Sequence, residues 1–336
     1  MPDKRAGSRE PGAGSRKPRA GSGGPGAGNP IATLEERAGL LAQRQTVAAL
    51  VLEVARVLAS GTGPLARGFV GDASNRQAVE LIAALLDVPR HWPLLRANKW
   101  VEGDVWRRAI AAARMHGAGA PLAYAVGRVN FRQLTLDVDD RVLIPRPETE
   151  LLVDLVLQHT REGVAVDVGT GSGAIALSLA AEGNFQRVIA TDVSLDALDV
   201  TRANAARLDI RVEVAHGDLL DAVTPLLVAT AADVIVSNPP YIAFEEIADL
   251  PASVRDWEPT TALVSAENGL ATTARLVRQA AGKLAGGGLL ALEVDARRAS
   301  LTAELVSRDE RLENVTVHLD LSGRERFVLA TRRSDR

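Results

Sequence analysis

The four consecutive residues Asn238-Pro239-Pro240-Tyr241 carry the most specific chemical pattern in the sequence. An amide or exocyclic amine nitrogen is a poor nucleophile, because its lone pair is delocalised. The side-chain oxygen of Asn238 and the carbonyl oxygen of Pro239 can each accept one of its N–H groups, which aims the lone pair at an incoming methyl group and takes up the positive charge that forms. The two prolines stiffen the backbone, and Tyr241 offers a flat wall to a planar amide or base. The pattern predicts methyl transfer to a planar nitrogen, with no general base required.

A second segment with chemical potential is the glycine-rich run from Asp167 to Gly173. Gly169 and Gly171 allow a tight turn and the close approach of a ligand to bare backbone, and Gly173 allows a helix start to pack against the strand. The G-x-G-x-G spacing is tighter than the G-x-G-x-x-G of dinucleotide sites, although NAD, FAD and S-adenosylmethionine sites all use a glycine loop. The residues expected to contact a cofactor are Gly169, Thr170, Gly171, Ser172 and Gly173.

Two aspartates follow predicted strands further along the chain. Asp192 lies 23 residues after Gly169, where a carboxylate can accept hydrogen bonds from both hydroxyl groups of a ribose. A free diol suits the adenosine of S-adenosylmethionine as well as NAD, so Asp192 alone does not choose between them. Asp218 is expected either beside the adenine or as the N-cap of a helix over Leu219–Val228.

These segments are placed by an alternation of strands and helices that starts at Val164. The predicted parallel strands are Val164–Val168, Arg187–Asp192, Arg211–His216, Asp233–Ser237 and Gly288–Val294. Such alternation predicts an α/β fold with a doubly wound parallel sheet, which binds ligands beyond the carboxyl ends of its strands. The glycine loop and the Asn238 tetrapeptide should therefore share one crevice. Two final strands, Asn314–Leu319 and Arg326–Thr331, are joined by too few residues for a helical crossover and must pair antiparallel.

The region before the sheet divides into three parts. Residues 1–30 contain eight Gly and five Pro but no Leu, Ile, Val or aromatic residue, which predicts a disordered tail, with a basic arm that touches RNA or the ribosome as the alternative. Helical periodicity over Thr46–Ala59 and Arg76–Leu86 predicts an all-α domain over residues 31–120. Leu134–Val138 and Arg141–Ile144 flank an Asp-Asp turn, which predicts a β-hairpin in a linker over residues 121–146. The sheet domain then spans residues 147–336.

Composition excludes several classes of protein. The 336 residues include no cysteine, which rules out disulfides, cysteine-ligated zinc, iron–sulfur clusters and a thiol nucleophile. The five histidines are scattered without metal-ligand spacing, so no metal site is expected. No apolar run approaches the ~20 residues of a membrane-spanning helix, and no apolar stretch follows the first charges as in a secretory signal, so a cytoplasmic location without a membrane partner is expected.

The charge distribution weighs against nucleic acid as a substrate. The first thirty residues carry six Lys or Arg against two Asp or Glu, a net +4, which leaves −7 on the rest because the whole chain is −3. A protein that binds phosphate groups needs a basic groove, and the five Phe, two Tyr and four Trp are too few for a stacking platform.

Together these residues resemble the HemK/PrmC family, release factor glutamine N5-methyltransferases that use S-adenosylmethionine to modify the glutamine side-chain nitrogen in the Gly-Gly-Gln motif of peptide-chain release factors. The likeness runs from about Arg76 to Arg332. Its marks are Pro121–Tyr124 with Gly127, Val142–Glu150, Asp167–Gly173, Asn238–Ile242, Trp257–Pro259 with Ala262-Leu263, Asn268–Leu270 and Gly323-Arg324. The run Pro-Arg-Pro-Glu-Thr-Glu within Val142–Glu150 distinguishes this branch from the similar ribosomal-protein glutamine methyltransferases.

The resemblance implies an N-terminal helical substrate-recognition domain, a hairpin linker and a seven-stranded, Rossmann-like methyltransferase domain. It implies that the glycine loop, Asp192, Asp218, Leu219 and Asn238 bind S-adenosyl-L-methionine, with Leu219 at a position where an aromatic residue often lies near the adenine. It implies that Asn238–Tyr241 hold the substrate glutamine. The expected partner is a release factor and the expected state is a monomer.

Three other functions fit part of this pattern. An adenine-N6 methyltransferase of DNA or RNA would use the same tetrapeptide on an exocyclic amine, but the acidic body disfavours it. A non-catalytic module that binds a translation factor would have no need to retain both the glycine loop and the tetrapeptide. A nicotinamide dehydrogenase leaves the tetrapeptide unexplained.

Overall fold

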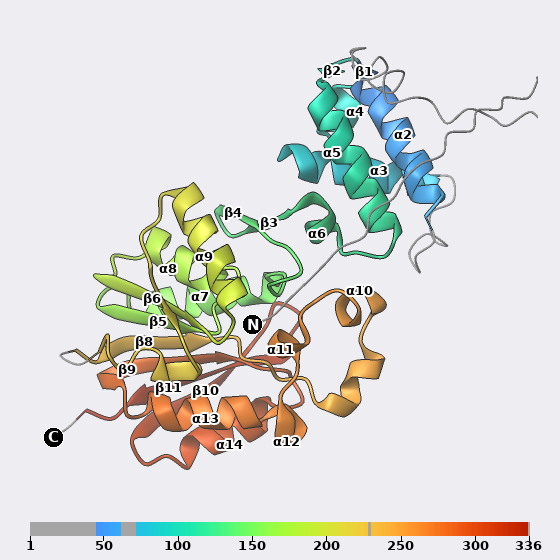
Figure 1. The fold of residues 1–336 in the computed structure, drawn as a ribbon. Coiled ribbons are helices and arrows are strands. Elements are labelled where there is room, and N and C mark those ends of the chain that lie inside the picture. Colours follow the sequence, from blue (N-terminus) through green and yellow to red (C-terminus); the bar gives the residue numbers. More distant parts are fainter. Residues whose placement is uncertain (1–44, 62–71, 228–229, 335–336) are drawn as a thin grey trace, which may run out of the picture. The chain divides into compact units, whose positions relative to one another are not determined.

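The computed structural model describes residues 45–61, 72–227 and 230–334, and its centre is a seven-stranded sheet (Figure 1). The strand order is β10-β11-β9-β8-β5-β6-β7, in which β5 to β9 run parallel and β10 and β11 form an antiparallel hairpin at one edge. The strands are β5 Val164–Val168, β6 Arg187–Asp192, β7 Glu213–His216, β8 Ala232–Ser237, β9 Leu284–Glu293, β10 Leu312–Leu319 and β11 Glu325–Arg332. The predicted mostly parallel α/β sheet with a terminal hairpin is confirmed.

Helices cover both faces of this sheet, as expected when parallel strands are apolar on both sides (Figure 1). One face carries α7, α8 and α9, and the other carries α13 and α14. The bounds of these helices are α7 Pro147–His159, α8 Ala174–Glu182, α9 Leu195–Leu208, α13 Ala271–Ala280 and α14 Ala299–Ser307. Pro147 suits the first turn of α7 because the amide hydrogen it lacks has no partner there, and the Ser194 hydroxyl caps α9 by accepting from the Ala197 amide at 3.2 Å.

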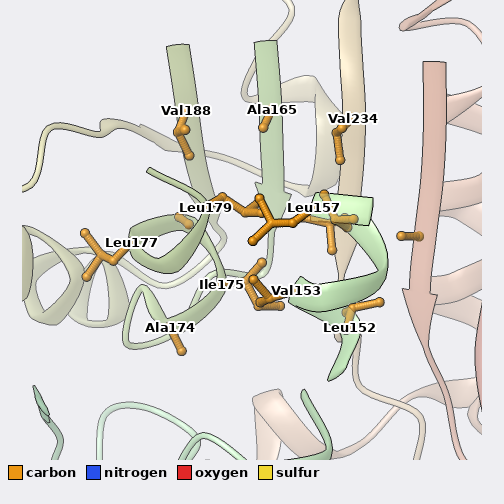
Figure 2. Packing of buried hydrophobic residues seen from close by; sticks show 14 of the residues in the cluster. Leu152, Val153, Leu157, Ala165, Ala174, Ile175, Leu177, Leu179, Val188 and Val234 are labelled. Carbon is orange, nitrogen blue, oxygen red and sulfur yellow. The ribbon is translucent and has the colours of Figure 1, made fainter. Parts of the chain in front are cut away.

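The core on the first face fixes α7 and α8 against the centre of the sheet (Figure 2). Apolar side chains of the two helices interlock over three adjacent strands: Leu152, Val153 and Leu157 from α7, Ile175 and Leu179 from α8, and Ala165, Val188 and Val234 from β5, β6 and β8. Leu152 and Leu179 are fully buried, and truncation of such a leucine to alanine costs about 2–5 kcal/mol. This packing places the first turn of α7 beside the ends of β8 and β9.

The described part of the helical domain is built on its own apolar core. Its helices are α2 Val47–Ala59, α3 Asp72–Leu86, α4 Trp92–Leu95 and α5 Gly103–Gly117, with a short pair of strands, β1 Gln45–Thr46 and β2 Trp100–Val101. Thr46 caps α2 by accepting a hydrogen bond from the Ala49 amide at 3.2 Å, and α3 begins four residues before its predicted start at Arg76. Leu50, Leu58 and Ile82 are completely buried. The predicted tail and the first part of the predicted all-α domain lie outside the described residues.

The predicted hairpin around the Asp-Asp turn is wrong. The hairpin instead pairs β3, Arg128–Phe131, with β4, Leu134–Asp137, across a two-residue turn that starts at Arg132. Arg132 adopts a φ of 54°, and its guanidinium donates to Glu182 and Asp154 at 2.7 Å. These tertiary ion pairs, which a local pattern does not reveal, stabilise the turn.

The residues that were expected to form the second strand turn away instead. The Asp139 carboxylate accepts from the Arg141 amide at 3.1 Å, which closes a local turn, and Val142 and Ile144 then bury their side chains against Tyr124 and α9. Before the true hairpin the linker also contains a short helix, α6, Leu122–Val126, which the sequence pattern missed.

A long excursion between β8 and α13 consists of short helical turns held by ion pairs. These turns are η3 Phe244–Asp249, α10 Ala252–Arg255, α11 Thr260–Leu263 and α12 Ala266–Gly269. Arg146 donates to both carboxylate oxygens of Glu258 at 2.7 and 2.8 Å, and Arg298 donates to Glu246 at 2.7 Å and to the Asn268 carbonyl at 2.6 Å. These contacts tie the excursion to the start of α7 and to the residue before α14.

Among the described residues, no helix is long and apolar enough to cross a membrane. In the same part of the chain, no three His, Asp or Glu side chains gather as a potential metal site.

Candidate functional site

The two predicted loops meet because β5 and β8 are neighbours in the centre of the sheet. Their register pairs Val168 with Ser237, so Gly169 and Asn238 leave the carboxyl ends of adjacent strands. The Ser237 hydroxyl donates to the Val168 carbonyl at 2.6 Å and joins the two strand ends directly. In the sheet, β6 lies on one side of β5 and β8 lies on the other, so the direction in which strands are added reverses at β5. Open α/β sheets bind ligands at such a reversal.

The glycine loop exposes its backbone to the space beyond these strand ends. Gly169 has a φ of 73° and Gly171 a φ of 56°, and a Cβ atom added to either residue would meet no atom within 4 Å. The loop is thus open where side chains would otherwise project, as a cradle for a ligand requires. Gly173 differs, because an added Cβ would lie 3.0 Å from Leu177 and 3.2 Å from Thr201. Gly173 therefore allows close packing against its own helix and α9, whereas the sequence predicted packing against the strand.

Side chains of α9 hold the outer side of the glycine loop. The Thr201 hydroxyl donates to the Gly171 carbonyl at 2.8 Å, and the Asn204 amide donates to the Ser172 carbonyl at 3.0 Å. Asn204 is fully buried and also bonds to both the amide and the carbonyl of Asp137 in the linker, at 2.8 and 2.9 Å. The loop is therefore rigidly positioned before any ligand binds.

Asp192 lies at the end of β6 with its carboxylate directed at the glycine loop. One oxygen accepts from the Gly171 amide at 3.0 Å and the other accepts from the Ser194 amide at 2.9 Å. Burial raises the pKa of this carboxyl group, and the backbone amides oppose that shift. A carboxylate has about four lone-pair positions, so Asp192 retains the capacity to accept a hydrogen bond from a ligand hydroxyl.

A cavity of about 230 Å³ brings most of the predicted site residues together. The predicted residues that line it are Gly169, Gly171, Asp192, Asp218, Leu219, Asn238 and Pro240. The predicted residues that are not among its lining are Thr170, Ser172, Gly173, Pro239 and Tyr241. A larger hollow of about 640 Å³ lies among α2, α3 and α4 and contains none of them, so chemistry favours the smaller cavity.

Asp218 and Leu219 line the same cavity after β7. Asp218 forms an ion pair with Arg275 from α13, and no side-chain capping bond from it is present. The turn that follows is a short 3₁₀ helix, η2, over Leu219–Asp221, so the alternative of an N-cap for a helix through Val228 is wrong as far as the described residues extend. Leu219 has a φ of 52°, a conformation that is costly for a branched side chain and that clusters at ligand sites.

Several residues of the cavity wall were not predicted as site residues. The linker contributes Arg141, Val142 and Leu143, and the excursion after β8 contributes Pro259 and Ala262. Some of these lie in segments that carried the family resemblance, but nothing in the local pattern assigned them to a cavity.

Asn238 is held by a residue of α7 that was not predicted to take part. Its Nδ2 atom donates to the Thr149 Oγ1 atom at 3.3 Å, and Thr149 is 4% exposed. The contact joins the Asn238 tetrapeptide to the Pro-Arg-Pro-Glu-Thr-Glu run, two motifs that lie far apart in the sequence.

Comparison with known proteins assigns a family to this arrangement. A family model described as "Methyltransferase small domain" matches residues 147–250, which include the glycine loop and the Asn238 tetrapeptide. A release factor glutamine methyltransferase from Deinococcus radiodurans is 39% identical over 256 residues, which cover 75% of this chain and 89% of that protein. The chain belongs to the release factor glutamine methyltransferase family.

Two further relatives of this family come from other bacteria. The release factor glutamine methyltransferase of Lactococcus lactis is 36% identical over 239 residues, 70% of this chain and 86% of the relative. That of Mycolicibacterium smegmatis is 42% identical over 214 residues, 63% of this chain and 75% of the relative. The predicted resemblance and the predicted enzyme class, a protein-glutamine methyltransferase, are confirmed. These names agree with the release factor branch and not with a dehydrogenase.

In this methyltransferase, the phenol of Tyr241 is not suited to proton transfer. Burial, followed by the charge of Glu293, raises the pKa of the Tyr241 phenol to about 12. The phenol is therefore protonated at neutral pH and cannot act as a base. Its predicted role as a wall beside the substrate stays a prediction, because its side chain does not line the cavity of about 230 Å³.

Asp167 is a completely buried acid beneath the glycine loop of this methyltransferase. Its Oδ2 atom accepts from the Thr170 hydroxyl at 2.6 Å and from the Ala176 amide at 3.1 Å, whereas its Oδ1 atom has no hydrogen-bond partner among the described residues. Burial raises the pKa of Asp167 from 3.8 to about 7, against the effect of these two donors. The charged form is thus costly in the folded chain.

We expect the stability difference between Asp167→Asn and the unchanged chain to depend on pH. The folded chain holds the Asp167 proton more tightly than the unfolded chain, so the contribution of Asp167 to stability is largest below pH 3.8 and falls as the pH rises to about 7. The total fall is at most about 4 kcal/mol, and asparagine, which does not titrate, does not show it. Urea unfolding of both proteins at acidic and alkaline pH measures the effect. A difference that is the same at both ends would show that Asp167 titrates normally.

Proposed function

We propose that the chain transfers a methyl group from S-adenosylmethionine to the side-chain amide nitrogen of the glutamine in the Gly-Gly-Gln motif of peptide-chain release factors. The observation that supports this most is the shared cavity: Asn238, at the end of β8, faces the same space as the open glycine loop and Asp192. Family membership supplies the substrate class.

The residues around the cavity fit the methyl donor. The open backbone at Gly169 and Gly171 can approach a ligand closely, and the Asp192 carboxylate keeps acceptor positions for the two ribose hydroxyls. Asp218 and Leu219 would flank the adenine from the end of β7. When bound, S-adenosylmethionine supplies an activated methyl group on a positively charged sulfur.

The chain itself holds and orients the acceptor nitrogen. The Asn238 Oδ1 atom and the Pro239 carbonyl would accept the two N–H groups of the substrate amide, which fixes the nitrogen and directs its lone pair into the cavity. These two oxygens also stabilise the positive charge that the nitrogen gains in the transition state. Neither is a base, so the proton that the nitrogen loses after transfer passes to water. Tyr241 and Pro240 would confine the planar amide.

The proposed reaction also suggests roles for the other parts of the chain. We assign recognition of the release factor to the helical domain over residues 31–120, with the linker over residues 121–146 between it and the catalytic domain over residues 147–336. A monomer suffices, because every residue to which we give a role lies on one chain. Translation termination places the reaction in the cytoplasm.

One assay tests the proposed function. Purified protein is mixed with S-adenosylmethionine that carries a labelled methyl group and with a release factor whose Gly-Gly-Gln glutamine is present or replaced by alanine. We expect label only in the factor that retains the glutamine. Equal label in both factors, or label only in added DNA, would overturn the proposal; the second result would favour an adenine-N6 methyltransferase.

A further inference from the structure

Asn238 is the first of three neighbouring polar side chains that lead away from the cavity. Its Nδ2 atom donates to Thr149 Oγ1 at 3.3 Å, and the Thr149 side chain lies beside the Glu293 carboxyl group, where its hydroxyl opposes the rise in pKa that burial causes. Thr149 is 4% exposed and Glu293 is 1% exposed. Neither Thr149 nor Glu293 lines the cavity.

The fold brings these three residues together from three separate elements. β8 and β9 are parallel neighbours whose register pairs Ser237 with Leu292, so Asn238 and Glu293 follow the ends of adjacent strands. Thr149 lies in the first turn of α7, whose start is fixed by the two bonds from Arg146 to Glu258 at 2.7 and 2.8 Å. The position of Thr149 between Asn238 and Glu293 is therefore set by the sheet and by this ion pair.

The direction of the hydrogen bonds follows from what each group can do. An ionised carboxylate only accepts, so when Glu293 is ionised the Thr149 hydroxyl is expected to direct its single hydrogen towards that carboxylate, which leaves its oxygen to accept from Asn238. That arrangement keeps the NH₂ end of the Asn238 amide towards α7. If the Asn238 amide were flipped, its oxygen would face Thr149. The only hydrogen of the Thr149 hydroxyl would already be directed at Glu293, so the Asn238 oxygen would have no donor.

We propose that Thr149 and Glu293 are positioning residues that keep the Asn238 amide in one orientation, with its Oδ1 atom free to accept from the substrate nitrogen. This inference rests on the proposed function, in which Oδ1 must accept an N–H group. An amide turned the other way would place the NH₂ group of Asn238 opposite the N–H group of the substrate, and two donors cannot form a hydrogen bond. Glu293 thus acts on the reaction through Thr149 and Asn238 without contact with substrate.

A change in the charge of Glu293 should alter the hydrogen bonds that link Glu293, Thr149 and Asn238. Burial raises its pKa to about 7, and its Oε2 atom has no hydrogen-bond partner among the described residues. A protonated carboxyl group can donate, which frees the Thr149 hydroxyl to turn and allows the amide to flip. Among the described residues, the other charged groups that act on Glu293 are Arg146, Glu148 and Arg326, and the charge of Glu293 in turn acts on Tyr241. Arg146 and Arg326 oppose the effect of burial, and Glu148 adds to it.

The first experiment measures the orientation of the amide without any reaction. The ¹⁵N and ¹H resonances of the Asn238 side chain are assigned by their loss in Asn238→Ala and followed over pH in the full chain. We expect them to shift with a midpoint near the pKa of Glu293, about 7, and to stay constant in Glu293→Gln. Resonances that do not shift in the unchanged chain, or that shift with the same midpoint in Glu293→Gln, would overturn the inference.

The second experiment measures methyl transfer to a release factor. Thr149→Val keeps the shape of the side chain but removes the hydroxyl group, so we expect kcat to fall about 10- to 100-fold while KM for the release factor changes less than about threefold. Thr149→Ser restores the hydroxyl and should return kcat to within about threefold of the unchanged enzyme. Thr316→Val, an exposed threonine of β10, is the matched control and should leave kcat unchanged.

The outcomes separate this inference from the proposed function. Normal kcat in Thr149→Val, or no recovery in Thr149→Ser, overturns the positioning role while the methyltransferase function stands. An unchanged enzyme that methylates no release factor overturns the proposed function and the positioning role with it, whatever the resonances show. If Glu293→Gln does not fold, the Thr149 pair and the resonances of the unchanged chain still decide the question.

Discussion

Replacement of Asn238 by alanine should lower kcat for methyl transfer about 10²- to 10³-fold, which is the usual cost of removing one preorganised group that stabilises transition-state charge. The variant loses the Oδ1 acceptor but keeps the Pro239 carbonyl, so the substrate nitrogen is held at one point and can rotate. Binding of S-adenosylmethionine should stay within about threefold, because the glycine loop and Asp192 make no hydrogen bond to the Asn238 side chain. Single-turnover rates with a saturating release factor measure the effect on chemistry alone.

The matched control for this variant is Asn184→Ala. Asn184 is an exposed asparagine between α8 and β6, at the opposite end of the parallel strands from Asn238. The control should retain the full rate. An Asn238→Ala enzyme that keeps more than about a tenth of the normal rate would contradict the acceptor role, and a rate loss matched by lost cofactor affinity would make Asn238 a binding residue.

Replacement of Asp192 by alanine should weaken binding of S-adenosylmethionine about 10²-fold. The side chain would accept two hydroxyl groups of the ligand, and each hydrogen bond to a charged group contributes about 1.5–3 kcal/mol, whereas about 1.4 kcal/mol is a tenfold change in affinity. The variant also frees the Gly171 amide, which donates to Asp192 at 3.0 Å, and so loosens the glycine loop. Titration calorimetry with the cofactor, in the absence of a release factor, measures the effect.

Asp199→Ala provides the comparison for charge. Asp199 lies on α9, is exposed and pairs with Arg202 at 2.8 Å, so its removal takes away the same charge without touching the cavity. Affinity should not change in this control. Should Asp192→Ala bind the cofactor as tightly as the control does, the assignment of Asp192 to the ribose would be wrong. The two variants Asn238→Ala and Asp192→Ala should thus separate, with the first impaired in kcat and the second in cofactor affinity.

The sheet was predictable because its strands are buried on both faces. Val164–Val168 is entirely buried and is apolar except for Asp167, and the ends of β5 and β6 fall at the predicted residues. The predicted strands and the rule that ligands bind beyond the carboxyl ends of parallel strands were enough to place the glycine loop and Asn238 correctly in one crevice. The boundaries of β7 and β9 were less accurate, because β7 is only partly buried and β9 runs through three consecutive glycines.

The errors arose where distant contacts override local pattern. Arg132 starts the true hairpin turn because Asp154 and Glu182 hold its guanidinium, and both lie far along the chain. Thr149 and Glu293 were missed for the same reason, since each looks like an ordinary helix or strand residue until α7 and β9 meet at Asn238. Local sequence therefore predicts the strands and the ligand-facing loops, whereas the side chains that orient the site become visible only in the folded protein.

The buried side chain of Asn204 has a consequence for communication within the molecule. It bonds to Ser172 in the glycine loop and to both backbone groups of Asp137 in the linker, at 2.8 to 3.0 Å. A displacement of the linker must break these bonds or pull the glycine loop with it. Any ligand that prefers one position of the linker must therefore alter affinity at the glycine loop, and a ligand at the glycine loop must alter affinity at the linker by the same factor, because binding free energies are reciprocal. One asparagine thus links the position of the linker to the position of the glycine loop.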